Sequence, residues 1–415
     1  MTDHPSSAKC VKCGACSAVC PVYLVTGRES VTARGKLHLV NTPPDKLSAA
    51  YSEIFSQCLL CGACEEVCSR GLKIRDIIAE TRARAAGPGR SINLKRLAAR
   101  RTLASPLLLK GLGNAGKIIS GLSEESGLLQ KLAFFSPDLP SLPQPDNPAE
   151  KLQKHKGEIN YFSGCLASYL APEIKKATVG LAGKAGGYGV RDNTDQTCCG
   201  LASYTAGKDK QARKLARLNI EAFEDNSDPI LISCASCYAH LKNYPDILAE
   251  DPVWKEKARL FSERLREFSS FLNQEMPENL HIQHQDNLRV AIHDPCHLRF
   301  GEEKITEAPR RLLRKANSNI ILEDIPARCC GNGGIFQINY PELSREIADK
   351  RIKDLTDSRL HFLLTTCSGC LIQLNRTIAG SGLSVKTHHL AVFINYLLDD
   401  SDFKAPAGTE RQNKS

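Results

Sequence analysis

The feature that most constrains this chain is the spacing of its 18 cysteines, which are distributed over 415 residues. Two runs near the N-terminus have the spacing C-x2-C-x2-C-x3-C, and two later blocks each combine a single cysteine, a Cys-Cys-Gly sequence and a C-x2-C pair. The runs are Cys10, Cys13, Cys16, Cys20 and Cys58, Cys61, Cys64, Cys68; the blocks are Cys165, Cys198, Cys199, Cys234, Cys237 and Cys296, Cys329, Cys330, Cys367, Cys370. Every cysteine belongs to a pattern typical of metal ligands, so we expect a fold built around thiolate-bound metal centres.

The two N-terminal runs match the bacterial pattern of paired [4Fe–4S] clusters, in which the fourth cysteine of each run ligates the other cluster. This rule predicts two crossed groups of ligands. The first ferredoxin set is Cys10, Cys13, Cys16 and Cys68, and the second ferredoxin set is Cys58, Cys61, Cys64 and Cys20. A zinc site is the alternative, because zinc also takes four thiolates. Eight cysteines at this spacing favour iron–sulfur clusters.

The two later blocks form an internal repeat. Cys165, Cys198 and Cys199 recur 131 residues further along the chain, and Cys234 and Cys237 recur 133 residues further along. Five positions that keep their register over such a distance predict two copies of one structural unit.

Short apolar runs precede the cysteines of each copy. Residues 159–164 and 229–233 precede Cys165 and Cys234, and residues 289–295 and 361–366 precede their counterparts. These runs predict buried strands, and the charged stretch 208–224 predicts a helix. Alternating strands and helices favour a largely parallel sheet, with the cysteines outside the carboxyl ends of its strands. Glycines beside the Cys-Cys pairs allow a close approach of the backbone to a bulky cluster.

Composition and the N-terminus indicate the compartment. Residues 1–10 have no signal-peptide pattern, and no apolar run approaches the roughly 20 residues of a membrane span. Thiols that serve as metal ligands must stay reduced, which disfavours a secreted disulfide framework. We therefore expect a cytoplasmic protein, either free or docked at the inner face of the cell membrane.

The net charge of +9 is concentrated in one region. Residues 70–117 contain twelve Lys or Arg and only two acids, Asp76 and Glu80. Such a stretch is either the solvated surface of helices or a docking surface for anionic lipid or an acidic partner. The chain has no nucleic-acid-binding module, and only 6% of its residues are aromatic, so a nucleic-acid partner is not expected.

The repeated blocks resemble the cysteine-rich CCG domain over residues 159–395. The matching sequences are SGC, CCG and SCASC in the first copy, and HDPC, CCG and TCSGC in the second. In the heterodisulfide reductase family such sites hold noncubane [4Fe–4S] clusters, so the resemblance implies one or two further clusters of this kind. Spacing alone implies only a thiolate-rich iron or zinc site, and zinc in one copy stays open as an alternative.

The predicted fold class is an α-helical ferredoxin domain followed by a duplicated α/β CCG domain with largely parallel sheets. Residues 32–40 and 45–55, between the two N-terminal runs, have a helical pattern that resembles the ferredoxin domains of respiratory enzymes. The predicted segments are a ferredoxin domain at 1–85, a basic helical segment at 86–136, a Pro-rich linker at 137–158, CCG domains at 159–275 and 276–400, and a polar tail at 401–415.

This architecture resembles the iron–sulfur subunits of glycolate oxidase and of related D-lactate dehydrogenases, notably in the sequences CPVY at 20–23 and ARGK at 33–36. The resemblance implies an oxidoreductase component that relays electrons from a separate FAD-containing subunit to a quinone or another acceptor. The sequence contains no phosphate loop and no dinucleotide-binding Gly-rich motif, so flavin and NAD are not expected in this chain. We assign no catalytic residue to it.

Two other functions stay open at this point. The intact C-x2-C pairs and the sequence HDPCHL at 293–298 are similar to the catalytic subunit of heterodisulfide reductase, which implies disulfide reduction at the CCG cysteines. A zinc-stabilised scaffold without redox activity is the other alternative.

Several histidines lie near the CCG cysteines. His293 and His297 flank Cys296, and His240 follows Cys237. Each is a candidate to tune a cluster or to deliver a proton, although hydrogen bonding to the surrounding structure is the commoner role of such residues. We expect His388 and His389 to be structural.

Overall fold

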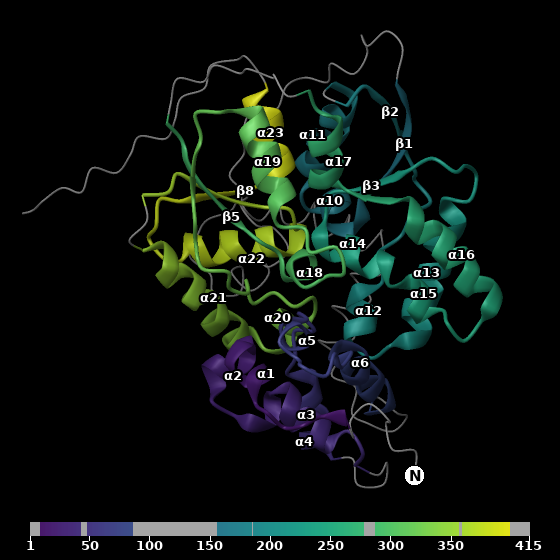
Figure 1. Cartoon of the computed structure of the whole chain (residues 1–415), viewed down its shortest axis with the longest axis vertical. Coiled ribbons are helices and arrows are strands. Elements are labelled where there is room, and N and C mark those ends of the chain that lie inside the picture. Colours follow the sequence, from purple (N-terminus) through teal and green to yellow (C-terminus); the bar gives the residue numbers. More distant parts are fainter. Residues whose placement is uncertain are drawn as a thin grey trace, which may run out of the picture.

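The structure, a computed structural model, describes residues 9–42, 48–85, 156–184, 186–277, 287–356 and 359–398. The predicted basic segment, nearly all of the predicted Pro-rich linker and the predicted polar tail lie outside these residues. Figure 1 shows a helical N-terminal part, in purple, packed against two α/β units in teal and in green to yellow. The helical part contacts both units.

Helices are the only regular elements among the described residues of the N-terminal part. Its elements are α1 (Ala15–Val19), α2 (Pro21–Thr26), a 3-10 turn η2 (Glu29–Val31), α3 (Ala33–Leu39), α4 (Ala49–Ser56), α5 (Ala63–Glu66) and α6 (Ile74–Ala85). Thr32 caps α3 by accepting a hydrogen bond from the Gly35 N–H, and Ser48 caps α4 in the same way. These two helices confirm the helical pattern predicted for residues 32–40 and 45–55, except for residues 45–47, which lie outside the described residues.

The first CCG domain contains a four-stranded parallel sheet with the order β2-β1-β3-β4. Strand β1 begins at Gly157, two residues before the predicted start of the first CCG domain at 159, because Gly157 and Glu158 pair with β2. The elements are β1 (Gly157–Phe162), α10 (Gly164–Tyr169), α11 (Pro172–Lys184), β2 (Tyr188–Asp192), α12 (Leu201–Thr205), α13 (Asp209–Ala222), β3 (Ile230–Ile232), α14 (Ala235–Lys242), α15 (Tyr244–Ile247), α16 (Pro252–Arg264), β4 (Leu265–Glu267) and α17 (Phe268–Glu275).

The second CCG domain repeats this topology, with a parallel sheet in the order β6-β5-β7-β8. The elements are β5 (Arg289–His293), α18 (Cys296–Arg299), α19 (Glu307–Ala316), β6 (Ile321–Glu323), α20 (Phe336–Asn339), α21 (Pro341–Leu355), β7 (Phe362–Thr365), α22 (Ser368–Ala379), β8 (Lys386–His389) and α23 (Leu390–Leu397). The two matching sheets confirm the duplicated, largely parallel α/β fold that the internal repeat predicts.

In each sheet the first strand lies between the second and the third, so the chain order reverses beside β1 and beside β5. Crevices at such reversals, outside the carboxyl ends of the strands, are where open α/β sheets bind ligands. The predicted strands before the cysteines are confirmed as β1, β3, β5 and β7. The other four strands were not predicted, because they carry polar or exposed residues and lack a continuous apolar run.

The two CCG domains share one hydrophobic core. Helix α11 packs against α23, and α17 packs against α19, so that Leu181, Phe271, Leu313 and Phe393 belong to one buried cluster. The backbone also joins the domains, because the Ala235 N–H donates to the carbonyl oxygen of Thr366 over 2.9 Å. This packing fixes the carboxyl end of β3 against the carboxyl end of β7.

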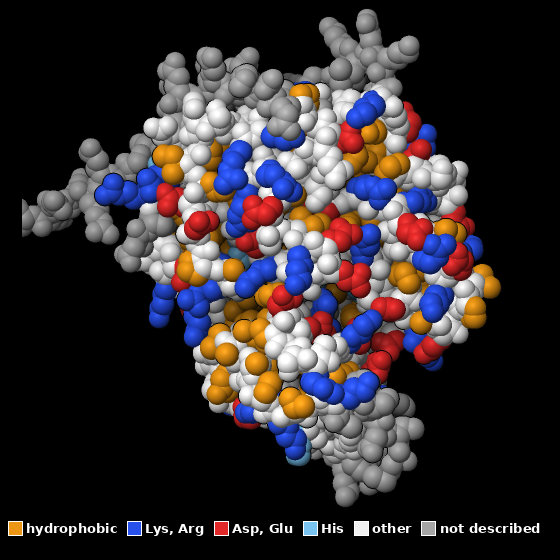
Figure 2. Space-filling model, in the orientation of Figure 1, with side chains coloured by type: hydrophobic (Ala, Val, Ile, Leu, Met, Phe, Trp, Pro, Cys, Tyr) orange, Lys and Arg blue, Asp and Glu red, His pale blue; other side chains and the backbone are white. Residues whose placement is uncertain are grey.

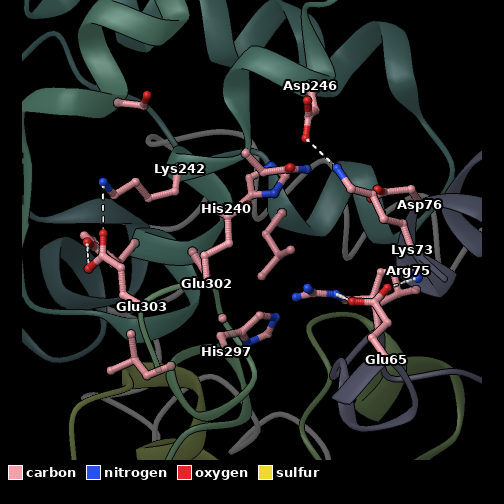
Figure 3. Close-up of a pocket in the computed structure, with 18 of the residues that line it drawn as sticks. Glu65, Lys73, Arg75, Asp76, His240, Lys242, Asp246, His297, Glu302 and Glu303 are labelled. Carbon is pink, nitrogen blue, oxygen red and sulfur yellow. Dashed lines mark hydrogen bonds and ion pairs between the residues drawn. The ribbon is translucent and has the colours of Figure 1, made fainter. Parts of the chain in front are cut away.

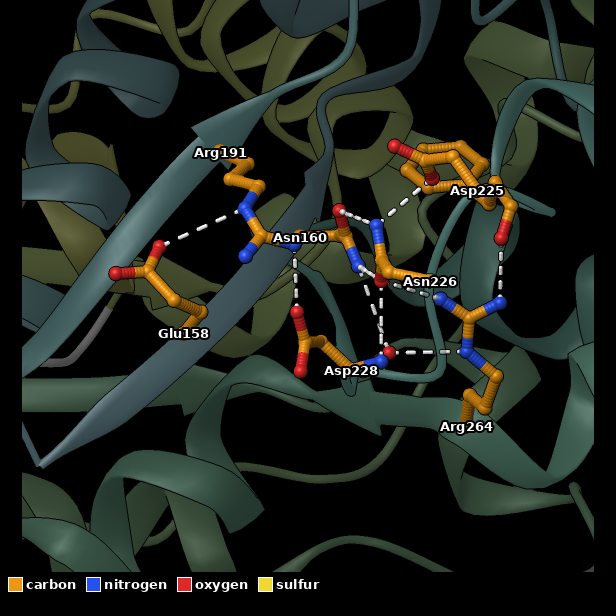
Figure 4. Close-up of polar contacts among 8 residues, drawn as sticks. Glu158, Asn160, Arg191, Asp225, Asn226, Asp228 and Arg264 are labelled. Carbon is orange, nitrogen blue, oxygen red and sulfur yellow. Dashed lines mark hydrogen bonds and ion pairs between the residues drawn. The ribbon is translucent and has the colours of Figure 1, made fainter.

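A polar network holds the amino end of β3 to the rest of the first sheet (Figure 4). Arg264 donates to the carbonyl oxygens of Phe223 and Asp228, over 2.5 and 2.9 Å, and to Asn226 Oδ1 over 3.1 Å. Arg191 of β2 binds the Asp228 carboxylate over 2.6 Å. The network lies at the end of β3 opposite to Cys234 and stabilises the sheet without touching the cysteines.

Replacement of Arg264 by methionine is expected to lower the free energy of unfolding by about 2 kcal/mol, because three charge-assisted hydrogen bonds are lost together. Chemical denaturation checks the loss, and iron content should stay at the wild-type level. Arg259→Met serves as the matched control, since Arg259 forms ion pairs on the exposed face of α16. A loss of iron in Arg264→Met would contradict a purely structural role.

His388 of β8 makes the fold sensitive to pH. Burial lowers the pKa of His388 to about 4, and the nearby Lys386 adds to the shift. The histidine of the unfolded chain binds a proton near pH 6.5, whereas His388 in the folded chain stays neutral until about pH 4. The free energy of unfolding therefore falls as the pH drops from about 6.5 towards 4. When the pH is lowered from 7.5 to 5, the free energy of unfolding of His388→Gln should fall by about 2 kcal/mol less than that of the wild type, as measured by urea denaturation. Equal losses in both proteins would contradict a buried neutral imidazole.

Candidate metal centres

The two N-terminal cysteine runs fold into loops of the same shape. In each loop the residue before the second cysteine and the glycine after it have positive φ angles: 57° at Lys12, 84° at Gly14, 51° at Leu60 and 85° at Gly62. Non-glycine residues adopt this conformation at an energetic cost and do so mainly at functional sites. The third cysteine of each loop then lies on a short helix, α1 or α5.

The fourth cysteine of each run lies beside the other run. Cys68 lines a small cavity of about 30 Å³ together with Cys10, Cys13 and Cys16. Cys20 lines a second cavity of about 30 Å³ together with the remaining three cysteines, Cys58, Cys61 and Cys64. Cys64 borders both cavities. The chain thus brings together the same two groups of four thiols that the crossed ligand rule predicts.

The two sets differ in their exposure to solvent. Cys13 of the first ferredoxin set is exposed, as are its neighbours Val11 and Lys12. Burial raises the pKa of Cys61 in the second ferredoxin set to about 12. A free thiol at this position would stay protonated at neutral pH, whereas a bound metal ion deprotonates a coordinating thiol. The second set is therefore suited to holding a metal centre away from water.

Two cations that the sequence analysis did not single out lie beside the second ferredoxin set. Lys36 of α3 lines the cavity that the thiols of the second ferredoxin set also line. Arg82 of α6 donates to the carbonyl oxygen of Cys58 over 2.6 Å. Arg82 also donates to Thr205 O of the first CCG domain over 2.6 Å and so ties the two domains together. Part of the basic run at 70–117 is thus buried structure, neither a solvated face nor a docking surface.

The CCG cysteines lie where the strands end. Cys165 follows β1, and Cys234 and Cys237 begin α14 directly after β3; the Cys198–Cys199 pair occupies the loop between β2 and α12. The second copy repeats each position: Cys296 begins α18 after β5, Cys329 and Cys330 lie between β6 and α20, and Cys367 and Cys370 begin α22 after β7. Gly164 has a φ of 67°, and a Cβ there would lie 3.2 Å from Cys237 Sγ.

All ten CCG cysteines line one cavity of about 130 Å³ between the two domains, which we call the CCG cavity. Within it Cys330 Sγ lies 3.2 Å from Cys370 Sγ, and Cys165 Sγ lies 3.8 Å from Cys198 Sγ. The Ser236 hydroxyl lies 3.3 Å from Cys234 Sγ and 3.6 Å from Cys367 Sγ. The repeat predicts a cysteine group in each copy, but not that the two groups face each other.

The CCG cavity also borders the ferredoxin domain. Leu59, between Cys58 and Cys61, lines the CCG cavity, and a Cβ on Gly333 would lie only 2.3 Å from its Cδ2 atom. Burial raises the pKa of the Cys296 thiol, and the charge of Cys61 raises it further. The second ferredoxin set and the CCG cysteines are therefore close neighbours.

The histidines near the cysteines divide into two groups. His389 is structural, because its Nε2 donates to Ser233 O over 2.8 Å and its Nδ1 accepts from the Ala391 N–H. His293 lies against Cys330 and Cys370, with all three possible ligand atoms within 4.8 Å of one another. His297 Nδ1 lies 3.7 Å from Cys296 Sγ. His293 and His297, the two histidines near Cys296 in the sequence, therefore both lie beside thiols of the CCG cavity.

A second, polar cavity of about 430 Å³ lies where the ferredoxin domain meets both CCG domains (Figure 3). Several of its charged groups form ion pairs: Arg75 pairs with Glu65 over 2.6 Å and Lys242 pairs with Glu303 over 3.1 Å. His297 lines this cavity and the CCG cavity alike. The histidine therefore separates a polar, water-accessible space from the thiols.

The chemistry of the donor atoms agrees with iron–sulfur clusters as the bound groups. Each small cavity of the ferredoxin domain offers the four thiols of one ferredoxin set, with Cys64 bordering the other cavity as well, and all 18 cysteines are free of disulfide bonds. Thiolates are the usual protein ligands of such clusters. The buried cations Lys36 and Arg82 also require a negative group beside them, which a thiolate-bound cluster provides.

Comparison with known proteins agrees with this geometry. Residues 6–72 match the model of the 4Fe-4S dicluster domain, and residues 159–242 and 290–375 match that of the cysteine-rich domain. A probable glycolate oxidase iron–sulfur subunit of Bacillus subtilis is 30% identical over 419 residues, covering 94% of this chain and 93% of that protein. This chain belongs to the family of glycolate oxidase iron–sulfur subunits. It is thus an iron–sulfur protein of the oxidoreductase class.

Two further curated proteins are similar to this chain, one over most of its length and one over little more than half of it. The glycolate oxidase iron–sulfur subunit of Escherichia coli is 26% identical over 380 residues, which cover 88% of this chain and 89% of that protein. A lactate utilization protein A of Halalkalibacterium halodurans is 30% identical over 244 residues, which cover 58% of this chain and 97% of that protein. Within the described part of the chain, no helix is both long and apolar enough to cross a membrane.

Proposed function

We propose that this chain is the electron-transfer subunit of a flavin-dependent dehydrogenase that oxidises a 2-hydroxyacid, glycolate or lactate. The observation that carries the proposal is the continuity of the three thiol groups, which run from the exposed Cys13 through the second ferredoxin set to the CCG cavity. The names of the relatives indicate the hydroxyacid. A separate subunit carries the FAD and oxidises the substrate.

The proposed ligands are the two crossed ferredoxin sets and the ten CCG cysteines. Bound there, [4Fe–4S] clusters supply one-electron redox chemistry. The cysteines hold them, the backbone N–H groups of Leu60, Gly200 and Gly331 point at cysteine sulfurs over 3.3 to 3.5 Å, and the glycines admit their bulk. Five thiols per CCG domain exceed the four of a cubane, which supports a noncubane cluster in each copy.

We propose that the FAD-containing subunit docks at the exposed edge of the first ferredoxin set. Val11 is 60% exposed beside Cys10, and Leu24 of α2 is also exposed. Figure 2 shows hydrophobic side chains gathered over α1 and α2 at this end of the molecule. Lys9, Lys12 and Arg70 surround the edge with positive charge, which favours an acidic patch on the partner. The final acceptor is a quinone or another carrier, met in the cytoplasm or at the inner membrane face.

The dehydrogenase proposal is tested by reconstitution. The FAD-containing subunit is assayed for hydroxyacid-dependent reduction of a quinone analogue, alone and with this chain in its iron-loaded form. We expect rapid quinone reduction only when both proteins are present. Equal rates without this chain, or a purified chain that contains zinc and no iron, would overturn the proposal.

A second candidate function is reduction of a disulfide at the CCG cavity. The observation in its favour is that all ten cysteines line one cavity and that Cys165, Cys296 and Cys329 are partly exposed there. Two electrons and two protons would convert a bound disulfide into two thiols. The iron-loaded chain, reduced with dithionite and then freed of it, is mixed with a heterodisulfide. Formation of two thiols per disulfide would favour this candidate over electron transfer to a carrier.

A further inference from the structure

Lys36 is a lysine buried beside the thiols of the second ferredoxin set. Its side chain is 1% exposed, and its ammonium donates to the carbonyl oxygens of Val31 and Gln57. The preceding residue, Gly35, allows α3 to pack closely against η2. A Cβ on Gly35 would lie 2.3 Å from the Glu29 carbonyl oxygen, so only glycine fits at position 35. The sequence RGK thus places a cation inside the domain.

Arg82 is a second buried cation at the same place, and its side chain is 8% exposed. Its guanidinium donates to the carbonyl oxygens of Phe55, Ser56 and Cys58, as well as to Thr205. Among the described residues neither Lys36 nor Arg82 forms an ion pair with a carboxylate. By contrast, Arg75 in the same cavity is paired with Glu65.

Two buried cations without carboxylate partners need another source of negative charge. Backbone carbonyl dipoles offset only part of the cost of removing a full charge from water. Burial lowers the pKa of Lys36, and the charges of Cys58 and Cys20 act against that shift. The thiolates of the second ferredoxin set, with the cluster they hold, are the negative group that faces both cations.

The surroundings of the first ferredoxin set are different. The cations that line its cavity are Lys12 and Arg70, which are exposed, and Arg34, which is half-buried, so water and salt reach and screen their charges. Arg34 is in addition paired with Glu29 over 2.6 Å. Reduction adds one negative charge to a cluster, and a cation stabilises the added charge far more strongly in a buried site than in a solvated one.

We infer that Lys36 and Arg82 act as fixed counter-charges that set the reduction potential at the second ferredoxin set above that at the first. They are positioning residues, since they act through the thiolates and touch no substrate. The inference rests on the iron–sulfur ligand sets of the proposed function, but not on its hydroxyacid, its FAD partner or its acceptor. It makes the buried set the stronger electron acceptor of the two.

The test is an anaerobic redox titration of the full-length, iron-loaded chain, followed by electron paramagnetic resonance (EPR). Lys36→Met and Lys36→Gln remove the charge, and Lys36→Arg keeps it. In both neutral variants we expect the higher-potential signal of the wild type to move to lower potential. At a given applied potential, the ratio of reduced to oxidised cluster should fall at least tenfold. For a one-electron couple tenfold corresponds to about 59 mV. Lys36→Arg should titrate like the wild type.

Lys255→Met is the matched control, because Lys255 is an exposed lysine on α16 of the first CCG domain, and it should leave the higher potential unchanged. Unchanged potentials in both neutral variants, or a shift of the lower-potential signal instead, would overturn the inference. Loss of iron from both neutral variants but not from Lys36→Arg would support the counter-charge role. Loss from all three would overturn it. Because the isolated chain is titrated, failure of the hydroxyacid assay would leave this result interpretable.

Discussion

Serine in place of Cys20 is expected to abolish the same EPR signal that serine in place of Cys61 abolishes. The two residues are 41 positions apart, yet both thiols line one cavity, whereas Cys16 in the run of Cys20 lines the other. About half of the iron of the ferredoxin domain should be lost in either variant, because each set holds one of two clusters. EPR of the dithionite-reduced, iron-loaded protein and its iron content are the measurements.

The reciprocal pair completes this test. Cys68→Ser should remove the signal that Cys10→Ser removes, and Ser69→Ala, a neighbouring change outside the ligand sets, should leave both signals intact. If Cys20→Ser removed the signal belonging to Cys10 and Cys13, each run would ligate its own cluster. That result would contradict the crossed assignment.

Serine in place of Cys234 is expected to disturb the metal centres of both CCG domains. Cys234 belongs to the first domain, but Ser236 links its sulfur to that of Cys367 in the second, and the packing of β3 against β7 holds them together. We expect electron transfer from the reduced ferredoxin domain to a quinone analogue to fall at least about 100-fold, as loss of a direct ligand outweighs loss of its supporting contacts. Both ferredoxin signals should remain.

Stopped-flow oxidation of the pre-reduced protein measures this rate. Ser236→Ala is the matched variant, since it removes the hydroxyl between the two sulfurs and keeps all ten thiols, and its rate should fall by a smaller factor. A Cys234→Ser protein that loses iron from one CCG domain only, and keeps the wild-type rate, would contradict a shared cavity.

The sequence predicts most of the fold because its strongest patterns are local. The strands before Cys165, Cys234 and their counterparts are short, buried and apolar, so hydrophobic pattern alone identifies them. The sequence pattern does not predict strands β4 and β8, because Arg266, Lys386 and His388 make them polar. Pairing within the parallel sheets stabilises these strands nonetheless. Helices α3 and α4 of the ferredoxin domain agree with the predicted helical pattern and begin at the caps Thr32 and Ser48.

The site could be predicted only in part, because its remaining features depend on how domains pack. Spacing identifies all 18 candidate ligands, but the meeting of ten of them in one cavity depends on α11 packing on α23 and α17 on α19. Lys36 and Arg82 lie in helices whose charged residues suggest solvated faces, and nothing local reveals their burial. The burial of Lys36 depends on its packing against a distant part of the chain, where its ammonium donates to the Gln57 carbonyl oxygen.

The most direct test of the electron-transfer account is rapid-freeze EPR of this chain in complex with its FAD-containing partner. The complex is mixed anaerobically with glycolate or lactate, without an added acceptor. We predict that the signals of the reduced ferredoxin clusters appear as the hydroxyacid is consumed, and that they fail to appear when this chain carries Cys61→Ser and Cys13→Ser together. Reduction of the flavin with no reduction of any iron–sulfur cluster in the wild-type chain would contradict the account.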